Sequence, residues 1–152
     1  MFDKKDLAKV KKETEKFFEE MGFEVEIKLS VENETLQLNL TSNEPQILIG
    51  EKGSILVQIQ RLLKAILNRK IGKFFYIDLD INDYKKKKIQ YLKEMAKEVA
   101  DKVALTKEEK ALSPMSAYER RVIHLELADR ADVTTQSIGR EPERRVVIKP
   151  YS

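Results

Sequence analysis

The sequence predicts an α+β fold made of two small consecutive domains, at residues 1–82 and 83–152. Apolar residues follow helical and strand periods in alternating blocks. The last strand-like block of the first domain ends near Ile81, and a single long helical block follows it. At 152 residues and 41% apolar content, the chain can bury the core of one ordinary domain or of two small ones.

The first domain is predicted to begin with a helix at residues 4–21 and a β-hairpin. Gly22 is a candidate C-cap for the helix, and a polar turn near Asn33 separates two runs of alternating apolar and polar residues. The apolar positions are Leu7, Val10, Phe17 and Met21 in the helix, Val25, Ile27, Leu29 and Val31 in the first strand, and Leu36, Leu38 and Leu40 in the second.

A glycine-bounded corner between two helices is predicted next. Pro45 opens a short helix that ends at Gly50, and apolar residues resume helical spacing beyond Gly53. From Phe75 to Ile81 the period becomes two, which indicates a third strand. The first domain is thus helix, strand, strand, short helix, helix, strand.

The second domain is predicted to start with a long helix from about Tyr84 to Leu105, which Asn82 or Asp83 can cap. A second helix at residues 116–128 and strands at 133–138 and 144–149 follow it. The predicted buried stripe of the long helix consists of Ile89, Leu92, Ala96, Val99 and Val103.

Composition excludes several classes of function. The chain has no cysteine and one histidine, so we expect no disulfide, no thiolate or multi-histidine metal site, and no cofactor. It also lacks a Walker glycine loop and a serine, histidine and carboxylate arrangement, so we expect no catalysis. No apolar run reaches the roughly 18 residues of a membrane span, and the charged N-terminus does not resemble a signal peptide. These features predict a cytoplasmic protein.

Charge is distributed unevenly along the chain. Residues 1–81 hold 13 basic and 14 acidic side chains, whereas residues 82–152 hold 16 basic and 12 acidic ones. The excess positive charge in the second half suits an anionic partner, and a solvated lysine-rich helix face would give the same count. The run from Lys85 to Lys88 has the same two interpretations, a phosphate contact or a solvated turn.

The glycine corner reads Gly50, Glu51, Lys52 and Gly53. Alone, this spacing is typical of a plain turn between helices. Beside a two-stranded apolar sheet and a long amphipathic helix it is also typical of a KH domain, in which glycines let the backbone approach about four nucleotides of single-stranded RNA or DNA. Lys52 can pair with a phosphate, whereas Glu51 would repel one. The apolar turn that ends at Ile49 can form the floor of a groove for the bases.

A second candidate site lies on the helix at residues 116–128. Arg120 and His124 are four residues apart, so both project from one face, where a guanidinium and an imidazole can bind phosphate or a base. The alternative is that His124 is a satisfied, partly buried core residue. Basic residues nearby favour nucleic acid and extend the candidate set to Arg121, Arg144 and Arg145.

Both sites resemble one known family. Residues 48–62 resemble the KH motif of the bacterial Jag proteins, also called KhpB or EloR. Residues 113–124 resemble that family's Pro-Met-x-x-Tyr-Glu-Arg-Arg-x-x-His signature, which marks its R-x-x-x-H (R-three-H) domain. Where the family tends to have arginines after the third strand, this sequence has the lysine run. The family's further small N-terminal domain has no counterpart in the printed sequence.

The resemblance implies a type II KH domain followed by a small α/β R-x-x-x-H domain. It implies a non-catalytic protein that binds single-stranded RNA, with single-stranded DNA left open, and that takes part in regulating bacterial cell elongation and division. It further implies a homodimer or a heterodimer with a second, small KH protein. The remaining alternative is a protein-interaction module for which RNA binding is incidental.

Overall fold

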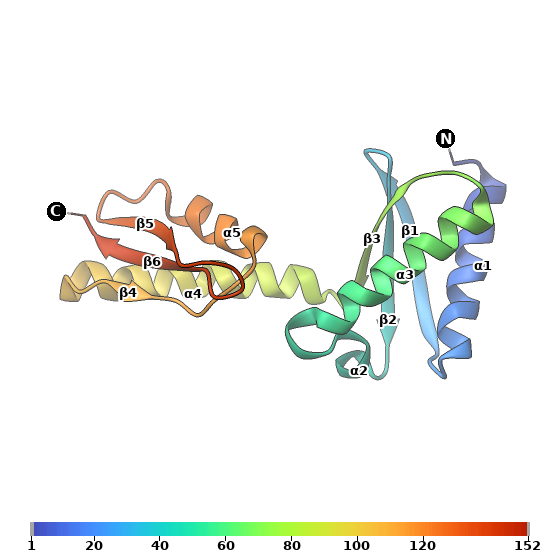
Figure 1. Ribbon diagram of the computed structural model, residues 1–152, viewed down its shortest axis with the longest axis horizontal. Coiled ribbons are helices and arrows are strands. Elements are labelled where there is room, and N and C mark those ends of the chain that lie inside the picture. The colour runs from blue at the N-terminus through green and yellow to red at the C-terminus, as the bar shows by residue number, and fades with distance from the viewer. Residues whose placement is uncertain (1, 152) are drawn as a thin grey trace. The chain divides into compact units, whose positions relative to one another are not determined.

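The computed structural model describes residues 2–151 and divides the chain into two compact units, Met1–Lys85 (unit 1) and Lys86–Ser152 (unit 2). Each unit combines helices with one three-stranded sheet (Figure 1). The predicted α+β class is therefore confirmed at the level of mixed helices and small sheets.

Unit 1 has the predicted order of helices and strands. Its sheet has the strand order β1-β2-β3, with β1 antiparallel and β3 parallel to β2. The elements are α1 (Lys4–Glu20), β1 (Val25–Glu32), β2 (Thr35–Ser42), α2 (Pro45–Ile49), the 3-10 turn η1 (Glu51–Gly53), α3 (Ser54–Ile71) and β3 (Tyr76–Ile81).

Helix α1 is closed at both ends by its own sequence. At the start, Asp3 and Asp6 form a reciprocal capping box. At the end, Gly22 has φ +90° and the Phe23 N–H donates to the Phe18 carbonyl at 2.9 Å, which is the Schellman arrangement expected after a C-cap.

The buried face of α1 differs from the prediction. Val10, Thr14 and Phe18 are fully buried, whereas Met21 is 42% exposed. The three buried residues are spaced by four, so they stack on one side of the helix, while Met21 is the C-cap and lies beyond the last turn.

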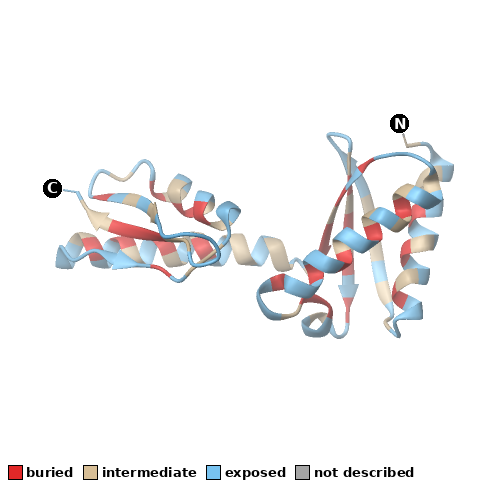
Figure 2. Cartoon of the chain, in the orientation of Figure 1, coloured by how far each residue is buried: buried red, intermediate tan, exposed pale blue. Residues whose placement is uncertain are grey.

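One face of the unit 1 sheet forms the core against the helices. A two-residue turn with positive φ at Asn33 and Glu34 joins β1 to β2, and in β2 and β3 the buried apolar residues alternate with polar ones (Figure 2). The core residues from the sheet and the helices α1, α2 and α3 are Val10, Phe18, Leu36, Leu38, Leu40, Leu48, Ile49, Leu56, Ile59, Leu63, Leu67, Phe75, Ile77, Leu79 and Ile81.

The start of α4 (Tyr84–Thr106) is held by a residue that the sequence did not indicate. The Asp80 carboxylate accepts from the Lys85 N–H at 3.0 Å, so it supplies a cap from the strand. Asn82, one of the two predicted caps, instead pairs its side-chain amide with the backbone N–H and C=O of Ser42. This arrangement continues the pairing of β2 and β3 by one step.

Unit 2 consists of most of α4 and a sheet of strand order β4-β6-β5. The elements after α4 are β4 (Lys110–Ala111), α5 (Ala117–Leu127), β5 (Val133–Ile138) and β6 (Arg145–Pro150). The sequence did not predict β4, because two residues carry no detectable period. The core is formed by Leu92, Ala96, Ala100, Val103, Leu112, Ile123, Leu127, Val133, Val146 and Ile148. Ile89 and Val99 of the predicted stripe are only half-buried.

Candidate nucleic-acid interface

The glycine corner is a strained backbone turn between α2 and α3. Gly50 has φ +73° and ψ −176°, a region that is essentially restricted to glycine, and Lys52 and Gly53 are both left-handed. The Gly50 N–H donates to the Gln46 carbonyl at 3.0 Å, and the Gly53 N–H donates to the Gly50 carbonyl at 3.3 Å. The conformation is therefore fixed on both sides of Glu51.

Neither glycine has room for a side chain. A Cβ on Gly50 would lie 2.6 Å from Cγ1 of Ile55, and a Cβ on Gly53 would lie 3.0 Å from Cε2 of Tyr84. Both positions also have positive φ. Ile55 and Tyr84 thus occupy the space that side chains would need, so both positions favour glycine, and Gly53 is itself buried.

The side chains at the corner form a small mixed surface. Glu51 and Lys52 are exposed, and the apolar residues Ile47 and Ile55 are 50% and 44% exposed. Ile49, which was predicted to contact RNA, is only 9% exposed and belongs to the core of unit 1. Its side chain packs into the core beneath the corner, and a contact between Ile49 and RNA stays a prediction.

Helix α3 begins at the corner without a side-chain cap. Its N-cap is Gly53, which has no side chain, and its first turn contains no acidic residue. The positive end of the helix dipole is therefore not neutralised locally, and it favours an anion at the corner.

Part of the lysine run contacts protein groups. Lys85 pairs with Asp78 at 2.6 Å and donates to the Gln60 side chain at 3.0 Å, both within unit 1. In unit 2, Lys88 lies 3.8 Å from a carboxylate oxygen of Glu119. These two lysines help to fasten α4 and are less available to a phosphate than the sequence suggested.

In unit 2, Arg120 is buried and already paired. Its side chain is 9% exposed, and Nη1 lies 2.8 Å from the Met115 carbonyl and 2.9 Å from Oε1 of Glu141. Glu141 itself is 61% exposed. One solvent-accessible carboxylate thus occupies the position at which an external anion would meet the guanidinium.

His124 is half-buried and fully hydrogen-bonded. Its Nδ1 lies 2.7 Å from the Thr135 hydroxyl and its Nε2 lies 2.7 Å from the Ser137 hydroxyl, both on β5. Burial, together with the charges of Arg120 and Arg144, lowers the pKa of His124 below its ordinary value. This environment favours the neutral imidazole, which contacts a hydroxyl group with each ring nitrogen.

Of the five predicted residues in this domain, the structure brings Arg120, His124 and Arg144 together. Arg144 acts on His124 through its charge and donates from Nη1 to the Gly139 carbonyl at 2.7 Å. Arg121 is exposed one position further around α5, and Arg145 pairs with Glu143 at 3.7 Å. In the register of β6, Arg145 lies on the sheet face opposite Val146, which faces the core.

Three residues of this cluster were not among the predicted site residues. Thr135 and Ser137 are two apart on a strand and share a face, a signal that becomes meaningful only once β5 is known to lie beside α5. Glu141 lies in a turn, where acidic residues are common and carry no signal of their own. Together with Arg120, His124 and Arg144 they form what we call the arginine-histidine cluster.

Two features are absent from the part of the chain that the structure describes. Residues 2–151 contain no group of three or more potential metal ligands, and none of their helices is long and apolar enough to cross a membrane.

Comparison with known families identifies the class of the second unit. Residues 90–150 match the family model of the R-three-H domain, and this range contains the whole arginine-histidine cluster. The resemblance of residues 113–124 to the R-x-x-x-H signature is thereby confirmed.

The chain as a whole is similar to bacterial proteins named RNA-binding protein KhpB. It is 36% identical over 137 residues to the one from Clostridium symbiosum, which covers 88% of this chain and 61% of that protein. It is 33% identical over 129 residues to the one from Lactiplantibacillus plantarum (85% and 40%), and 32% identical over 116 residues to the one from Bacillus subtilis (75% and 56%). The chain thus spans between 40% and 61% of the length of these relatives.

Proposed function

We propose that this chain is a non-catalytic, single-stranded RNA-binding protein of the KhpB kind. The observation that carries the proposal is the R-three-H match at residues 90–150, within which Arg120, His124 and Arg144 form one cluster. The sequence similarity to proteins named RNA-binding protein KhpB also supports the proposal. Single-stranded DNA offers the same phosphates and is an alternative ligand.

The two units take different roles in this proposal. Residues 1–82 act as a type II KH domain, a proposal that the order of elements and the parallel pairing of β2 with β3 support. Residues 83–152 act as the R-x-x-x-H domain. Gly50, Glu51, Lys52 and Gly53 form the RNA loop of the first domain, with Ile49 beneath it.

RNA binding at the corner depends mainly on the backbone. The sugar-phosphate chain passes the corner between Gly50 and Lys52, a phosphate is attracted to the uncapped start of α3, and the exposed Lys52 adds a cation. Glu51 lowers the affinity for phosphate at the same place.

RNA binding at the arginine-histidine cluster depends on an exchange. A phosphate of the RNA replaces the Glu141 carboxylate at Arg120. The Arg120 guanidinium is therefore paired with an anion both before and after binding. Neutral His124 keeps the Thr135 and Ser137 hydroxyls in fixed positions, where they can bond to RNA. Arg121 and Arg145 are attached to the same unit but lie outside the cluster, so they add general attraction to the RNA.

The wider role that we propose is post-transcriptional regulation in the bacterial cytoplasm, linked to cell elongation and division. As a partner we propose a second copy of this chain or a small KH protein. These statements rest on the resemblance to the Jag proteins.

The experiment that tests the proposed function is RNA affinity measured against salt by fluorescence anisotropy. The variants are Gly53→Asp and the pair Arg120→Ala with His124→Ala. For single strands, the slope of log affinity against log salt should fall by about 0.7 for each phosphate contact that is removed. Lys52→Asn serves as a gentler third variant, because asparagine accepts the left-handed conformation and only the charge is lost.

If the folded variants keep the parental RNA affinity and the parental salt slope, the proposal of RNA binding at these sites is wrong. The protein-interaction module would then be the better interpretation. Thermal unfolding of each variant shows whether a loss of affinity reflects a lost contact or a lost fold.

A further inference from the structure

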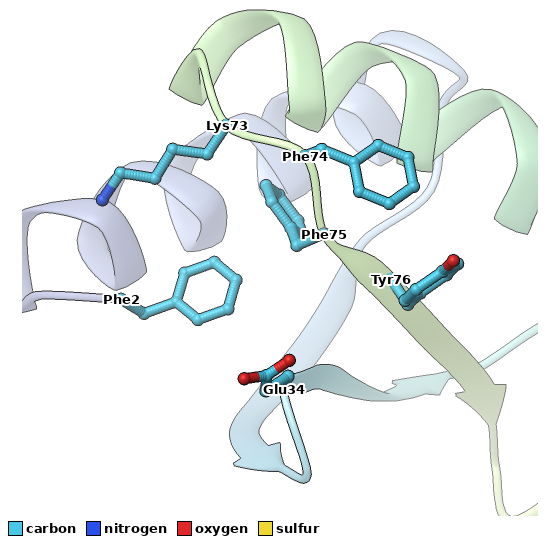
Figure 3. Close-up of a pocket in the computed structure, with 6 residues that line it drawn as sticks. All are labelled: Phe2, Glu34, Lys73, Phe74, Phe75 and Tyr76. Atoms are coloured by element: carbon cyan, nitrogen blue, oxygen red, sulfur yellow. The ribbon is translucent and has the colours of Figure 1, made fainter.

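Unit 1 contains an aromatic hollow that the glycine corner does not use. It has a volume of about 290 Å³ and is lined by Phe2, Glu34, Lys73, Phe74, Phe75 and Tyr76. Figure 3 shows that these side chains come from three segments: the chain before α1, the turn between β1 and β2, and the entry into β3. The volume is at the lower end of the range of about 300–1,000 Å³ found for small-molecule pockets, so it suits one planar ring system.

Two of the rings are unusually exposed. Phe74 is 74% exposed and Tyr76 is 58% exposed, although the residue between them, Phe75, is buried. The exposed rings hold each other edge to face, with centroids 5.2 Å apart and an angle of 81° between their planes. Phe75 packs in the same way on Phe2 at 4.9 Å and fixes the strand beneath them. These contacts hold the two exposed rings in a defined orientation.

The surroundings of this pair favour an anionic ligand. The Lys64 ammonium lies 4.9 Å from the ring centroid of Phe74 and 4.7 Å from that of Tyr76. Lys64 is the cation that contacts both rings among the described residues. Of the acidic groups nearby, Asp6 is neutralised by Lys73 at 2.6 Å, which leaves the carboxylate of Glu34 at the edge of the hollow.

We propose that the exposed rings of Phe74 and Tyr76, beside the aromatic hollow, bind one unpaired nucleobase of the RNA that the glycine corner holds. The base stacks on the face of one of the two rings and displaces the Lys64 ammonium, which then meets the neighbouring phosphate. This inference rests on the proposed RNA-binding function. A protein partner fits less well, because covering the rings would also remove Lys64 and Glu34 from water.

The position of the hollow gives the inference a measurable consequence. The corner precedes α3 and the hollow follows it, and an 18-residue helix is about 27 Å long. A strand of about four nucleotides, which is what a glycine corner of this type holds, cannot be expected to occupy both places. Only a longer RNA can gain affinity from the aromatic rings.

The test compares a single-stranded oligonucleotide of about four nucleotides with one about three times as long. Phe74→Ala combined with Tyr76→Ala should weaken binding of the long RNA by about tenfold and leave the short one unchanged. Tyr76→Phe, which keeps the ring, should bind both as the parent does. Tyr91→Ala removes a ring that is equally exposed (61%) but lies on α4, so it is the matched control.

Two further measurements sharpen the test. A 2-aminopurine placed in the long RNA should lose fluorescence on binding the parent, because the base stacks, and should keep it with the double variant. Lys64→Met should reduce the salt slope for the long RNA by about 0.7.

The inference is overturned if the double variant binds the long RNA as tightly as the parent. It is also overturned if the short and long RNAs weaken together, or if the double variant changes the oligomeric state and not the RNA affinity. If the parent binds no RNA at all, the proposed function itself fails, which is a different result.

Discussion

The two candidate sites are built from different parts of the polypeptide. At the glycine corner the proposed binding groups are peptides in a turn that needs glycine at positions 50 and 53, because Ile55 and Tyr84 occupy the space for side chains there. In the arginine-histidine cluster the binding groups are side chains, and each already has a partner within the protein: Glu141 for Arg120, and two hydroxyls for His124.

This difference predicts opposite responses to mutation. A backbone site is destroyed when an atom is added, because the turn must open. A side-chain site is destroyed when atoms are removed, and it can be improved when an internal competitor is removed. The expected effects range from the loss of a whole site to a small change in stability.

The largest effect is expected for Gly50→Ala. The new Cβ would lie 2.6 Å from Ile55, in a backbone region that costs a non-glycine residue about 1–3 kcal/mol. The corner should open, and RNA affinity of unit 1 should be lost. Thermal unfolding and RNA anisotropy measure the two effects.

Gly72→Ala is the matched control for that substitution. Gly72 has nearly the same φ, +76°, but a Cβ there meets nothing within 4 Å. It should lower stability slightly and leave RNA affinity unchanged. Equal losses in both variants would show that the corner has no special role.

Arg120→Ala should weaken RNA binding by about tenfold and reduce the salt slope by about 0.7, because one charge-assisted phosphate contact is lost. Arg121→Ala, in the adjacent exposed position, should change affinity by about twofold at most. If the two variants behave alike, the buried cluster is not the binding site and general attraction accounts for the affinity.

Glu141→Gln should strengthen RNA binding by a few fold, since a neutral amide competes less well than a carboxylate for Arg120. Glu143→Gln removes an equal charge from the same turn, but its partner is Arg145 outside the cluster, so its effect should be smaller. An unchanged affinity for Glu141→Gln would mean that phosphate does not displace this carboxylate.

The smallest effect is a pH dependence of stability in unit 2. Because the pKa of His124 is lowered in the folded protein, the unfolded chain takes up this proton first as the pH falls below about 6.5. The stabilisation of the folded state by neutral His124 is complete above that pH. It is lost as the pH falls towards the lower pKa that His124 has in the folded protein. His124→Gln should flatten this part of the curve of unfolding free energy against pH. If the slope stays the same, another group causes the pH dependence.

Much of the fold was predictable because it depends on local periods. Residues 25–40 alternate strictly, and the helix from Tyr84 begins where expected and ends at Thr106, one residue past the prediction. The errors lie where tertiary contacts decide: Asp80 caps α4 from a strand, and Phe18 replaces Met21 in the core.

The candidate sites were less predictable for the same reason. The two glycines are close in sequence, and their surroundings could be inferred from neighbouring elements. Arg120 has one local partner, the Met115 carbonyl, but its partner Glu141 and both partners of His124 lie 11 to 21 residues away, in β5 and the following turn. The interpretation of His124 as a satisfied, partly buried residue agrees with its two hydrogen bonds, and its contact with RNA stays a prediction.

The most direct test of two RNA sites on one chain is ultraviolet crosslinking of the full chain to single-stranded RNA, with crosslinked peptides identified by mass spectrometry. The account predicts crosslinks in two separate peptides, one around Gly50–Gly53 and one around the cluster of Arg120, His124, Thr135 and Ser137. Crosslinks confined to one of these peptides, or absent from both, would contradict it.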